Sequence, residues 1–307
     1  MPQLLSPQAA QQVVMVRPHH FQSNPETMAD NAFQRPLDST DSAFSAFTEV
    51  SEAAAKLRSY GVKVHLFEDL HGLTPDSVFP NNWFSCHHNG VLVSYPMYAA
   101  NRRLEYRQDI MDFLQSEYGF GQTLDLRGYA EQQQYLEGTG AIVFDHIQRR
   151  AYVCRSKRAD ESLLKRLCAQ LNYQAVIFDA FDSAGVAVYH TNVLMCVGSK
   201  FVLMGTDMVT SADRQRLLDG FAANQQQLIH LSEQQVAQFC GNAIELQGDN
   251  GPILALSETA YQALTSEQKL QLEQFVELVP LQVPTIESAG GSVRCMIAGI
   301  HNPGSPR

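Results

Sequence analysis

The amino-acid sequence predicts an α/β protein built as a five-fold pseudosymmetric propeller, in which five ββαβ units surround one axis. Strand-like and helix-like segments alternate along all 307 residues, and this pattern recurs at intervals of roughly 45 to 65 residues. Short polar or glycine turns, such as 88–90 and 249–251, join the paired strands and are typical of hairpins. Hairpins exclude a wholly parallel, doubly wound sheet.

The five units follow one another along the chain. The first three are expected at strand 13–18, helix 41–59 and strand 62–68; at strands 77–86 and 91–96, helix 101–117 and strand 123–126; and at strands 140–145 and 149–154, helix 160–171 and strand 174–180. The last two are expected at strands 187–198 and 200–205, helix 211–224 and strand 227–232, and at strands 242–248 and 251–257, helix 266–278 and a last strand 292–300. Each helix is expected to cover one sheet face, because apolar residues recur at i, i+3 and i+4, as in Leu163, Leu164, Leu167 and Leu171.

Composition narrows the class of protein. With 45% hydrophobic residues, the chain can bury a sizeable core, so we expect one catalytic domain over 13–307 after a frayed arm at 1–12. A formal charge of -10 argues against a nucleic-acid partner. No apolar run is long enough to span a membrane, and no secretory signal is evident, so we expect no membrane partner. Six scattered cysteines without a C-x-x-C pair favour a reducing, cytoplasmic location.

Four residues could carry chemistry: Asn82, Glu137, His190 and Cys295. Taken singly, each has an ordinary structural explanation: a turn amide, a loop acid, a hydrogen-bonded core histidine and an inert buried thiol. Their placement is the argument, because all four lie near the starts or ends of strands in different units. If the units surround one axis, these residues converge, and a thiol, an imidazole and a carboxylate can then act as nucleophile, acid/base and orienting group.

The sequence offers little sign of a metal or cofactor. The pairs His19-His20 and His87-His88 lack a third ligand at metal spacing, and adjacent histidines in a strand face opposite ways. No phosphate-binding or dinucleotide-binding glycine motif is present. We therefore expect neither a metal nor an organic cofactor.

Four segments resemble the guanidino-group-modifying superfamily, the penteins, in the order expected for that superfamily. They are D-S-V-F-P-N-N at 76–82, E-G-T-G at 137–140, H-T-N at 190–192 and the cysteine at 295. The resemblance covers most of the chain. The opening M-V-R-P-H-H-F-Q-S-N-P-E-T, with N-A-F-Q after it, is most similar to the arginine-deiminase-related citrulline-utilisation hydrolases.

The resemblance implies a role for each matching residue. Cys295 matches the nucleophile, His190 the general acid/base, and Glu137 a carboxylate that pairs with the substrate or with His190. The resemblance also implies that the substrate is bound by residues of the first and second segments of the chain and of the H-T-N motif, namely Arg17, Asp76, Phe79, Asn82 and Asn192. An α-carboxylate needs a cation, for which Arg17, Arg102 and Arg103 are candidates.

Two positions depart from the arginine-deiminase pattern. Asn82 and Asn192 fall where several members of the superfamily carry Asp. Because an amide both donates and accepts hydrogen bonds, these asparagines suit a neutral ureido group better than a cationic guanidinium.

The favoured interpretation is a metal-independent cysteine hydrolase that converts citrulline to ornithine, ammonia and carbon dioxide. Arginine dihydrolase and arginine deiminase activities stay open, as do an amidinotransferase and a catalytically dead binding protein. The partner is expected to be a small ureido or guanidino amino acid. A homodimer is the oligomeric state that analogy with acidic penteins implies.

Overall fold

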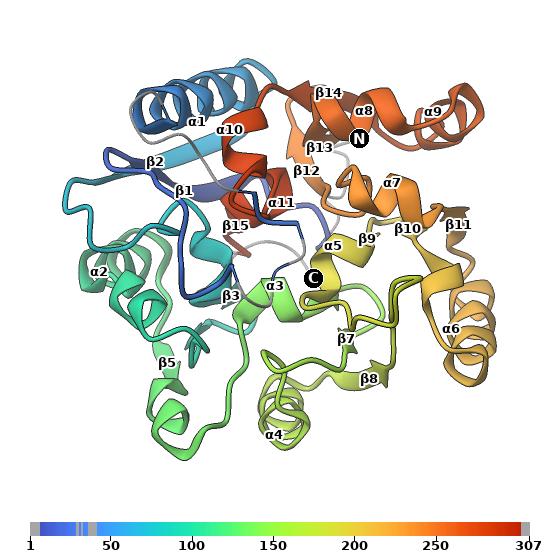
Figure 1. Ribbon diagram of the computed structural model, residues 1–307, viewed down its shortest axis with the longest axis horizontal. Helices are drawn as coiled ribbons and strands as arrows, with labels where there is room; N and C mark the ends of the chain where they lie inside the picture. Colours follow the sequence, from blue (N-terminus) through green and yellow to red (C-terminus); the bar gives the residue numbers. More distant parts are fainter. Residues whose placement is uncertain (1–6, 29–30, 32, 36–41, 302–307) are drawn as a thin grey trace.

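Each of the five units folds as a three-stranded sheet, and the five sheets form a ring in the order of the chain (Figure 1). The computed structural model describes residues 7–28, 31, 33–35 and 42–301. Each sheet has an inner strand next to the axis, a middle strand and an outer strand. The middle strand runs antiparallel to the inner strand and parallel to the outer strand. The predicted propeller of ββαβ units is therefore confirmed.

Neighbouring sheets meet through their inner strands: β6 contacts β9, β9 contacts β12 and β15 contacts β3. These inner strands are β3 Phe84–His87, β6 Val143–Asp145, β9 Met195–Val197, β12 Ile244–Gly248 and β15 Ala298–Gly299. The middle strands are β1 Gln12–Pro18, β4 Val91–Ser94, β7 Arg150–Cys154, β10 Phe201–Met204 and β13 Gly251–Ser257. The outer strands are β2 Lys63–Asp69, β5 Gln122–Asp125, β8 Gln174–Phe178, β11 Gln227–His230 and β14 Glu277–Leu281.

Helices cross from each middle strand to its outer strand and cover the outside of the ring (Figure 1). They are α1 Ser42–Ser59, α2 Gln108–Tyr118, α4 Glu161–Leu171, α6 Ser211–Ala223 and the pair α8 Glu258–Ala263 and α9 Ser266–Leu272. α4 shows why they form: Asp160 accepts a hydrogen bond from Leu163 N as N-cap, the predicted leucine stripe is buried, and Asn172 ends the helix with a φ of 57°. Shorter helices elsewhere are η2 Asn101–Glu105, η3 Arg127–Gln132, η4 Thr206–Met208, α7 Glu233–Ala237 and α10 Pro284–Glu287.

The last strand was assigned to the wrong unit. β15 pairs antiparallel with β1, with Val13 opposite Gly299 and Val14 opposite Ala298, so the C-terminal strand completes the first sheet and closes the ring. The fifth sheet takes its third strand from β14, part of which we expected to continue the helix at 266–278. That helix ends at Leu272, and the buried side chains of Val279 and Leu281 alternate with less buried ones, as in a strand.

Short helical turns, rather than extended strand, precede four of the inner strands. η1 Pro80–Asn82 precedes β3, α3 Gly138–Ala141 precedes β6, α5 Thr191–Leu194 precedes β9, and α11 Val293–Met296 precedes β15. Three of these turns, η1, α5 and α11, lie in segments that were expected to be strands. A short turn within a mostly apolar segment cannot be told from a buried strand by its sequence. The turns bring the polar residues of the sequence motifs to one end of the inner strands.

The N-terminal segment that we expected to be a frayed arm is packed in its described part. Ala9 and Ala10 are buried. The Gln8 side chain donates hydrogen bonds to Phe144 O at 3.0 Å and to Val197 O at 2.9 Å, at the end of the inner strands opposite the short turns. The part of the arm at 1–6 lies outside the described residues, as does position 41 of the first predicted helix.

Two further observations concern cysteines and membranes. All six cysteines are buried and unpaired. Within the described residues, no helix has both the length and the apolar character needed to cross a bilayer.

Candidate active site

A narrow cavity lies where the short helical turns gather. Asp76, Phe79, Asn82, His190 and Cys295, five of the predicted site residues, line it together. Its free volume is about 20 Å³, room for little more than one water molecule. The other lining residues come mainly from three loops and two buried arginines: Thr27, Asn31, Arg102, Arg158, Tyr189 and 289–291.

The Cys295 sulfur lies between two side-chain amides. Cys295 belongs to α11 and is 2% exposed. Asn192 Nδ2 and Asn242 Nδ2 each donate to its Sγ at 3.3 Å. Asn192 was predicted and Asn242 was not. The position of Asn242 in its repeat could have identified it: Asn242 lies two residues before β12, just as Asn82 lies two residues before β3.

His190 and Glu137 form a buried pair. His190 Nε2 lies 2.7 Å from Glu137 Oε2, and both side chains are almost fully buried. Burial lowers the pKa of His190 to about 4, although the hydrogen bond and charge of Glu137 oppose this shift. The imidazole is therefore neutral at pH 7. A carboxylate at Nε2 assigns the proton to that nitrogen and leaves the Nδ1 lone pair as the base.

Two buried arginines keep Glu137 ionised. Arg158 Nη1 lies 3.3 Å and Arg102 Nη1 3.9 Å from Glu137 Oε2. Burial alone would raise the pKa of Glu137, but Arg158, His190 and Arg102 outweigh it and hold that pKa well below its usual value. Arg158 was not predicted, because a single arginine in a loop carries no sequence signal.

Arg102 is held by carboxylates of its own. It forms a bidentate pair with Glu105, at 2.8 Å and 2.9 Å, and its Nε lies 3.6 Å from Asp76 Oδ2. Burial raises the pKa of Asp76 and raises that of Glu105 to about 7, while Arg102 opposes both shifts. With its amide oxygen turned towards Arg102, Asn82 accepts from Nη1 at 3.0 Å and from Nη2 at 3.1 Å. The carboxamide of Asn82 is therefore already engaged by the protein.

The structure does not bring Arg17 or Arg103 to this cavity. Arg17 pairs with Glu68 and lies over the Phe47 ring at 4.3 Å, among residues that do not line the cavity. Arg103 donates to Met97 O at 3.0 Å and to Tyr98 O at 3.1 Å. The structure therefore places Arg17, which was expected to bind substrate, away from this cavity: it lies on β1, a middle strand, and pairs with Glu68 on the outer strand β2.

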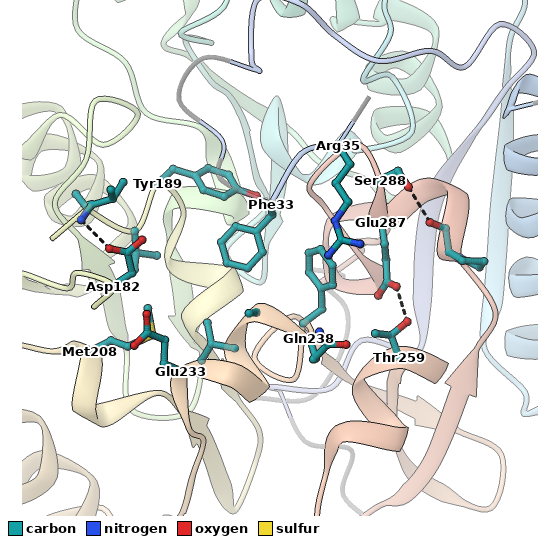
Figure 2. A pocket seen from close by; sticks show the side chains of 17 residues that line it. Phe33, Arg35, Asp182, Tyr189, Met208, Glu233, Gln238, Thr259, Glu287 and Ser288 are labelled. Carbon is teal, nitrogen blue, oxygen red and sulfur yellow. Dashed lines mark hydrogen bonds between the residues drawn. The ribbon is translucent and has the colours of Figure 1, made fainter. Parts of the chain in front are cut away.

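A larger cavity of about 450 Å³ lies beside the narrow one and shares Tyr189 with it (Figure 2). Phe33 and Arg35 point into it, opposite acidic residues that include Asp182, Glu233 and Glu287. Tyr189, which lines both cavities, donates from its Oη to the carbonyl oxygen of Gly290, which lines the narrow one. The catalytic residue types lie in the narrow cavity, and the larger one offers room for the rest of a ligand.

Comparison with known proteins gives one family and one fold. A sequence model of the family described as N,N dimethylarginine dimethylhydrolase, eukaryotic, matches residues 17–302. No curated protein matches the chain in sequence.

Three solved structures illustrate the likeness in fold. The N-terminal domain of ArgZ bound to substrate, described as an arginine dihydrolase from the ornithine–ammonia cycle in cyanobacteria, is 17% identical with a TM-score of 0.75, covering 94% of this chain and 97% of that one. Unliganded AgrE is 15% identical with a TM-score of 0.75, covering 94% and 39%. A dimethylarginine dimethylaminohydrolase adduct with 4-chloro-2-hydroxymethylpyridine is 12% identical with a TM-score of 0.65, covering 95% and 100%. These likenesses agree with the five-unit propeller.

Proposed function

The chain belongs to the N,N-dimethylarginine dimethylhydrolase family of hydrolases, which act on guanidino C–N bonds, and from this premise we propose that it is a cysteine hydrolase of a ureido amino acid, with citrulline as its preferred substrate. The observation that carries the proposal is the shared cavity of Cys295 and His190, with amides on the sulfur and Glu137 on the imidazole. A nucleophile and a base around one cavity, with an acid that orients the base, are the residue types that covalent catalysis requires.

The proposed reaction begins with the Cys295 thiol and the neutral His190 imidazole. Cys295 Sγ adds to the ureido carbon, and the thiol proton passes to the neutral His190. The tetrahedral adduct then expels an amine, which takes that proton as it leaves. Water, deprotonated by the same imidazole, hydrolyses the thiocarbamate to regenerate Cys295. The carbamic acid product loses carbon dioxide, so citrulline and one water give ornithine, ammonia and carbon dioxide.

Glu137 supports both proton transfers. Each transfer passes through an imidazolium at His190, and the buried carboxylate 2.7 Å away stabilises that charge. Without this carboxylate, the imidazolium would form close to Arg158 and Arg102 with no compensating charge.

Unpartnered acceptors near the cavity suit the N–H groups of a ureido substrate. Among the described residues, Asp76 and Glu105 face Arg102, and Glu137 faces Arg158 and His190. A neutral ureido group adds no charge to this buried set. A ureido group instead donates N–H bonds, and Asp76 Oδ1, Asn192 Oδ1 and Asn242 Oδ1 are buried acceptors without a partner among the described residues.

The larger cavity suits the α-amino acid end of citrulline. Arg35 provides a cation for the α-carboxylate, and Asp182, Glu233 and Glu287 provide charge for the α-ammonium group. The narrow cavity is too small for a ureido group as it stands, so its lining must shift when the ligand enters. We therefore assign Arg35 the place that Arg17 was expected to fill.

A second candidate follows from the family itself. Its description names dimethylarginine, so hydrolysis of that compound to citrulline and dimethylamine is the alternative for the same site. The two candidates differ in the charge of the substrate and in the product that accumulates.

Product analysis separates them. Purified protein is incubated with citrulline, arginine or dimethylarginine, and ornithine, citrulline, ammonia and dimethylamine are quantified. We expect the highest kcat/KM with citrulline, and a loss of at least about a thousandfold in Cys295→Ser. Cys240→Ser, which changes another buried thiol, is the matched control and is expected to keep normal turnover. A higher kcat/KM for dimethylarginine or arginine, or citrulline turnover that survives Cys295→Ser, would refute the proposal.

A further inference from the structure

Three histidines from distant parts of the chain meet at the opposite end of the inner strands from the cysteine. His88 directly follows β3, His146 directly follows β6, and His301 stands two residues after β15. One ring nitrogen from each lies within 4.8 Å of the other two. The His146 and His301 ring centroids are 3.9 Å apart, and the His88 ring lies 5.0 Å from His301.

Hydrogen bonds at the other ring nitrogens orient two of these imidazoles. His146 Nδ1 lies 2.7 Å from Tyr173 Oη, which leaves Nε2 for a ligand. His88 Nε2 lies 2.9 Å from the carbonyl oxygen of Pro7; because a carbonyl only accepts, this nitrogen carries the proton and Nδ1 keeps a lone pair. In metal-binding histidines, the ring nitrogen that does not bind the metal usually forms a hydrogen bond of this kind, which orients the imidazole.

The third histidine has a nitrogen that is otherwise unexplained. Nδ1 of His301 is buried and has no hydrogen-bond partner in the described part of the chain. Burying a polar atom in this way costs free energy unless something binds it. A metal ion would satisfy this nitrogen and the two free lone pairs of His88 and His146 together.

The surroundings of the cluster carry little net charge. The adjoining cavity, which His146 and His301 also line, carries one carboxylate, Glu245, and one guanidinium, Arg294.

We propose that His88, His146 and His301 bind a zinc ion, which ties the closing strand β15 to the second and third sheets of the ring. Three imidazoles with an open fourth position form a common zinc ligand set. Zn–N bonds of about 2.0 Å in a tetrahedron place the nitrogens about 3.3 Å apart, so small side-chain rotations complete the site. β15 has only two residues paired with β1, and the ion would add a second attachment at this end of the chain. The role is structural and separate from the cysteine chemistry.

The test is made on full-length, untagged protein carrying Cys295→Ser, so that zinc cannot bind the active-site thiol. The protein is stripped with a chelator, and Zn²⁺ binding is measured by competition with a chromogenic chelator and by thermal unfolding. We expect one Zn²⁺ per chain and a rise in Tm of several degrees. His301→Gln and His88→Gln should each weaken binding by at least about tenfold and abolish the Tm shift. Replacing Zn²⁺ with Co²⁺ should give the visible absorption of a tetrahedral site.

The matched control is His71→Gln, which changes an exposed histidine outside the cluster and should bind zinc normally. Absence of stoichiometric binding would overturn the proposal. So would binding that survives both cluster variants, or that falls equally in His71→Gln. Because every measurement uses a variant without the catalytic thiol, none of these outcomes bears on the proposed hydrolase activity.

Discussion

Glu137 is buried against His190, and the two side chains depend on each other for their charge states. In Glu137→Gln the imidazole keeps a hydrogen-bond partner but loses the negative charge that stabilises the imidazolium. We predict a fall in kcat of about 10²–10⁴-fold, measured as ornithine release from citrulline. Glu161→Gln, which changes a half-buried glutamate on α4 away from the cavity, is the control. A folded Glu137→Gln protein with kcat within a few-fold of the parent would show that the pair is only structural.

The pKa of His190 also makes a prediction about activity. Because that pKa is lowered to about 4, the imidazole of the free enzyme is a competent base at pH values well below 6.5. The acid limb of kcat/KM should therefore have its midpoint near 4 rather than near 6.5. A pH–rate profile with a midpoint at 6 or above would contradict the assignment of His190 as a buried, neutral base.

The two asparagines of the sequence motifs are not equivalent. Asn192 touches the Cys295 sulfur, whereas Asn82 is turned towards Arg102. Asn192→Asp should raise the ratio of arginine to citrulline kcat/KM by at least about tenfold, because a carboxylate there can pair with a guanidinium. Asn82→Asp should leave the ratio almost unchanged, since Arg102 will take up the new charge. Equal effects of the two substitutions would refute this distinction.

Sequence reasoning could single out residues such as His190, because a polar side chain is unusual in an apolar segment. The polar H-T-N triplet that begins at His190 interrupts an apolar segment, so it needs a structural or functional explanation. It could not find Arg158 or Asn242, whose importance comes only from the packing of distant loops around Glu137 and Cys295. It chose Arg17 wrongly for the same reason, since charge alone does not indicate distance from the axis.

Among the elements, α3 makes the closest backbone approach to the site. A Cβ at Gly140 would lie 2.2 Å from the Asn82 carboxamide and 2.9 Å from His190 Nδ1. Gly140→Ala should therefore displace His190 and lower kcat by at least about a hundredfold, because small misplacements of catalytic groups are costly. Gly128→Ala, where a Cβ would meet nothing within 4 Å, is the control. Normal turnover by Gly140→Ala would mean that His190 tolerates displacement.

Three long helices followed their sequence patterns closely, whereas α2 begins at Gln108 rather than at 101, because residues 101–105 form the separate short helix η2. The one-turn helices were not expected at all. α4 and α6 begin and end within about a residue of their expected bounds, because a 3.6-residue apolar period over several turns is a strong signal. A four-residue helix such as α5 contains one turn and no period. Its residues, 191–194, are all buried, as they would be in a buried strand.

For the whole molecule, buried neutral histidines predict sensitivity to acid. Burial lowers the pKa of His87 to about 3 and that of His190 to about 4. Unfolding restores each to about 6.5, so the unfolded state binds protons first and stability falls as the pH drops from 6.5 towards the folded pKa. At pH 5 the cost is about 2 kcal/mol for each such histidine.

Urea unfolding at pH 7.5 and pH 5 measures this effect. His87→Asn should lose less stability between the two pH values than the parent protein, by about 2 kcal/mol. Glu105, whose pKa is raised to about 7, acts with the opposite sign but equally in both proteins. His71→Asn, which changes an exposed histidine, should behave as the parent. An unchanged pH dependence in His87→Asn would contradict burial of a neutral imidazole.

Ring closure is the feature of the whole molecule that the sequence could least predict. Five similar units predict a ring, but no local pattern shows that residues 298–299 join the first sheet rather than the fifth. The meeting of His88, His146 and His301 depends on that closure, since the three lie far apart in sequence. Spacing along the chain therefore does not report which histidines the fold brings together.

The central claim is that Cys295 forms a covalent intermediate with its substrate. Mass spectrometry of protein quenched with acid during citrulline turnover, followed by proteolysis, tests it most directly. The account predicts added mass on the Cys295 peptide alone, equal to a carbamoyl group or to citrulline less ammonia, and greater accumulation in Glu137→Gln. Steady turnover of citrulline with an unmodified Cys295 peptide at every quench time would contradict it.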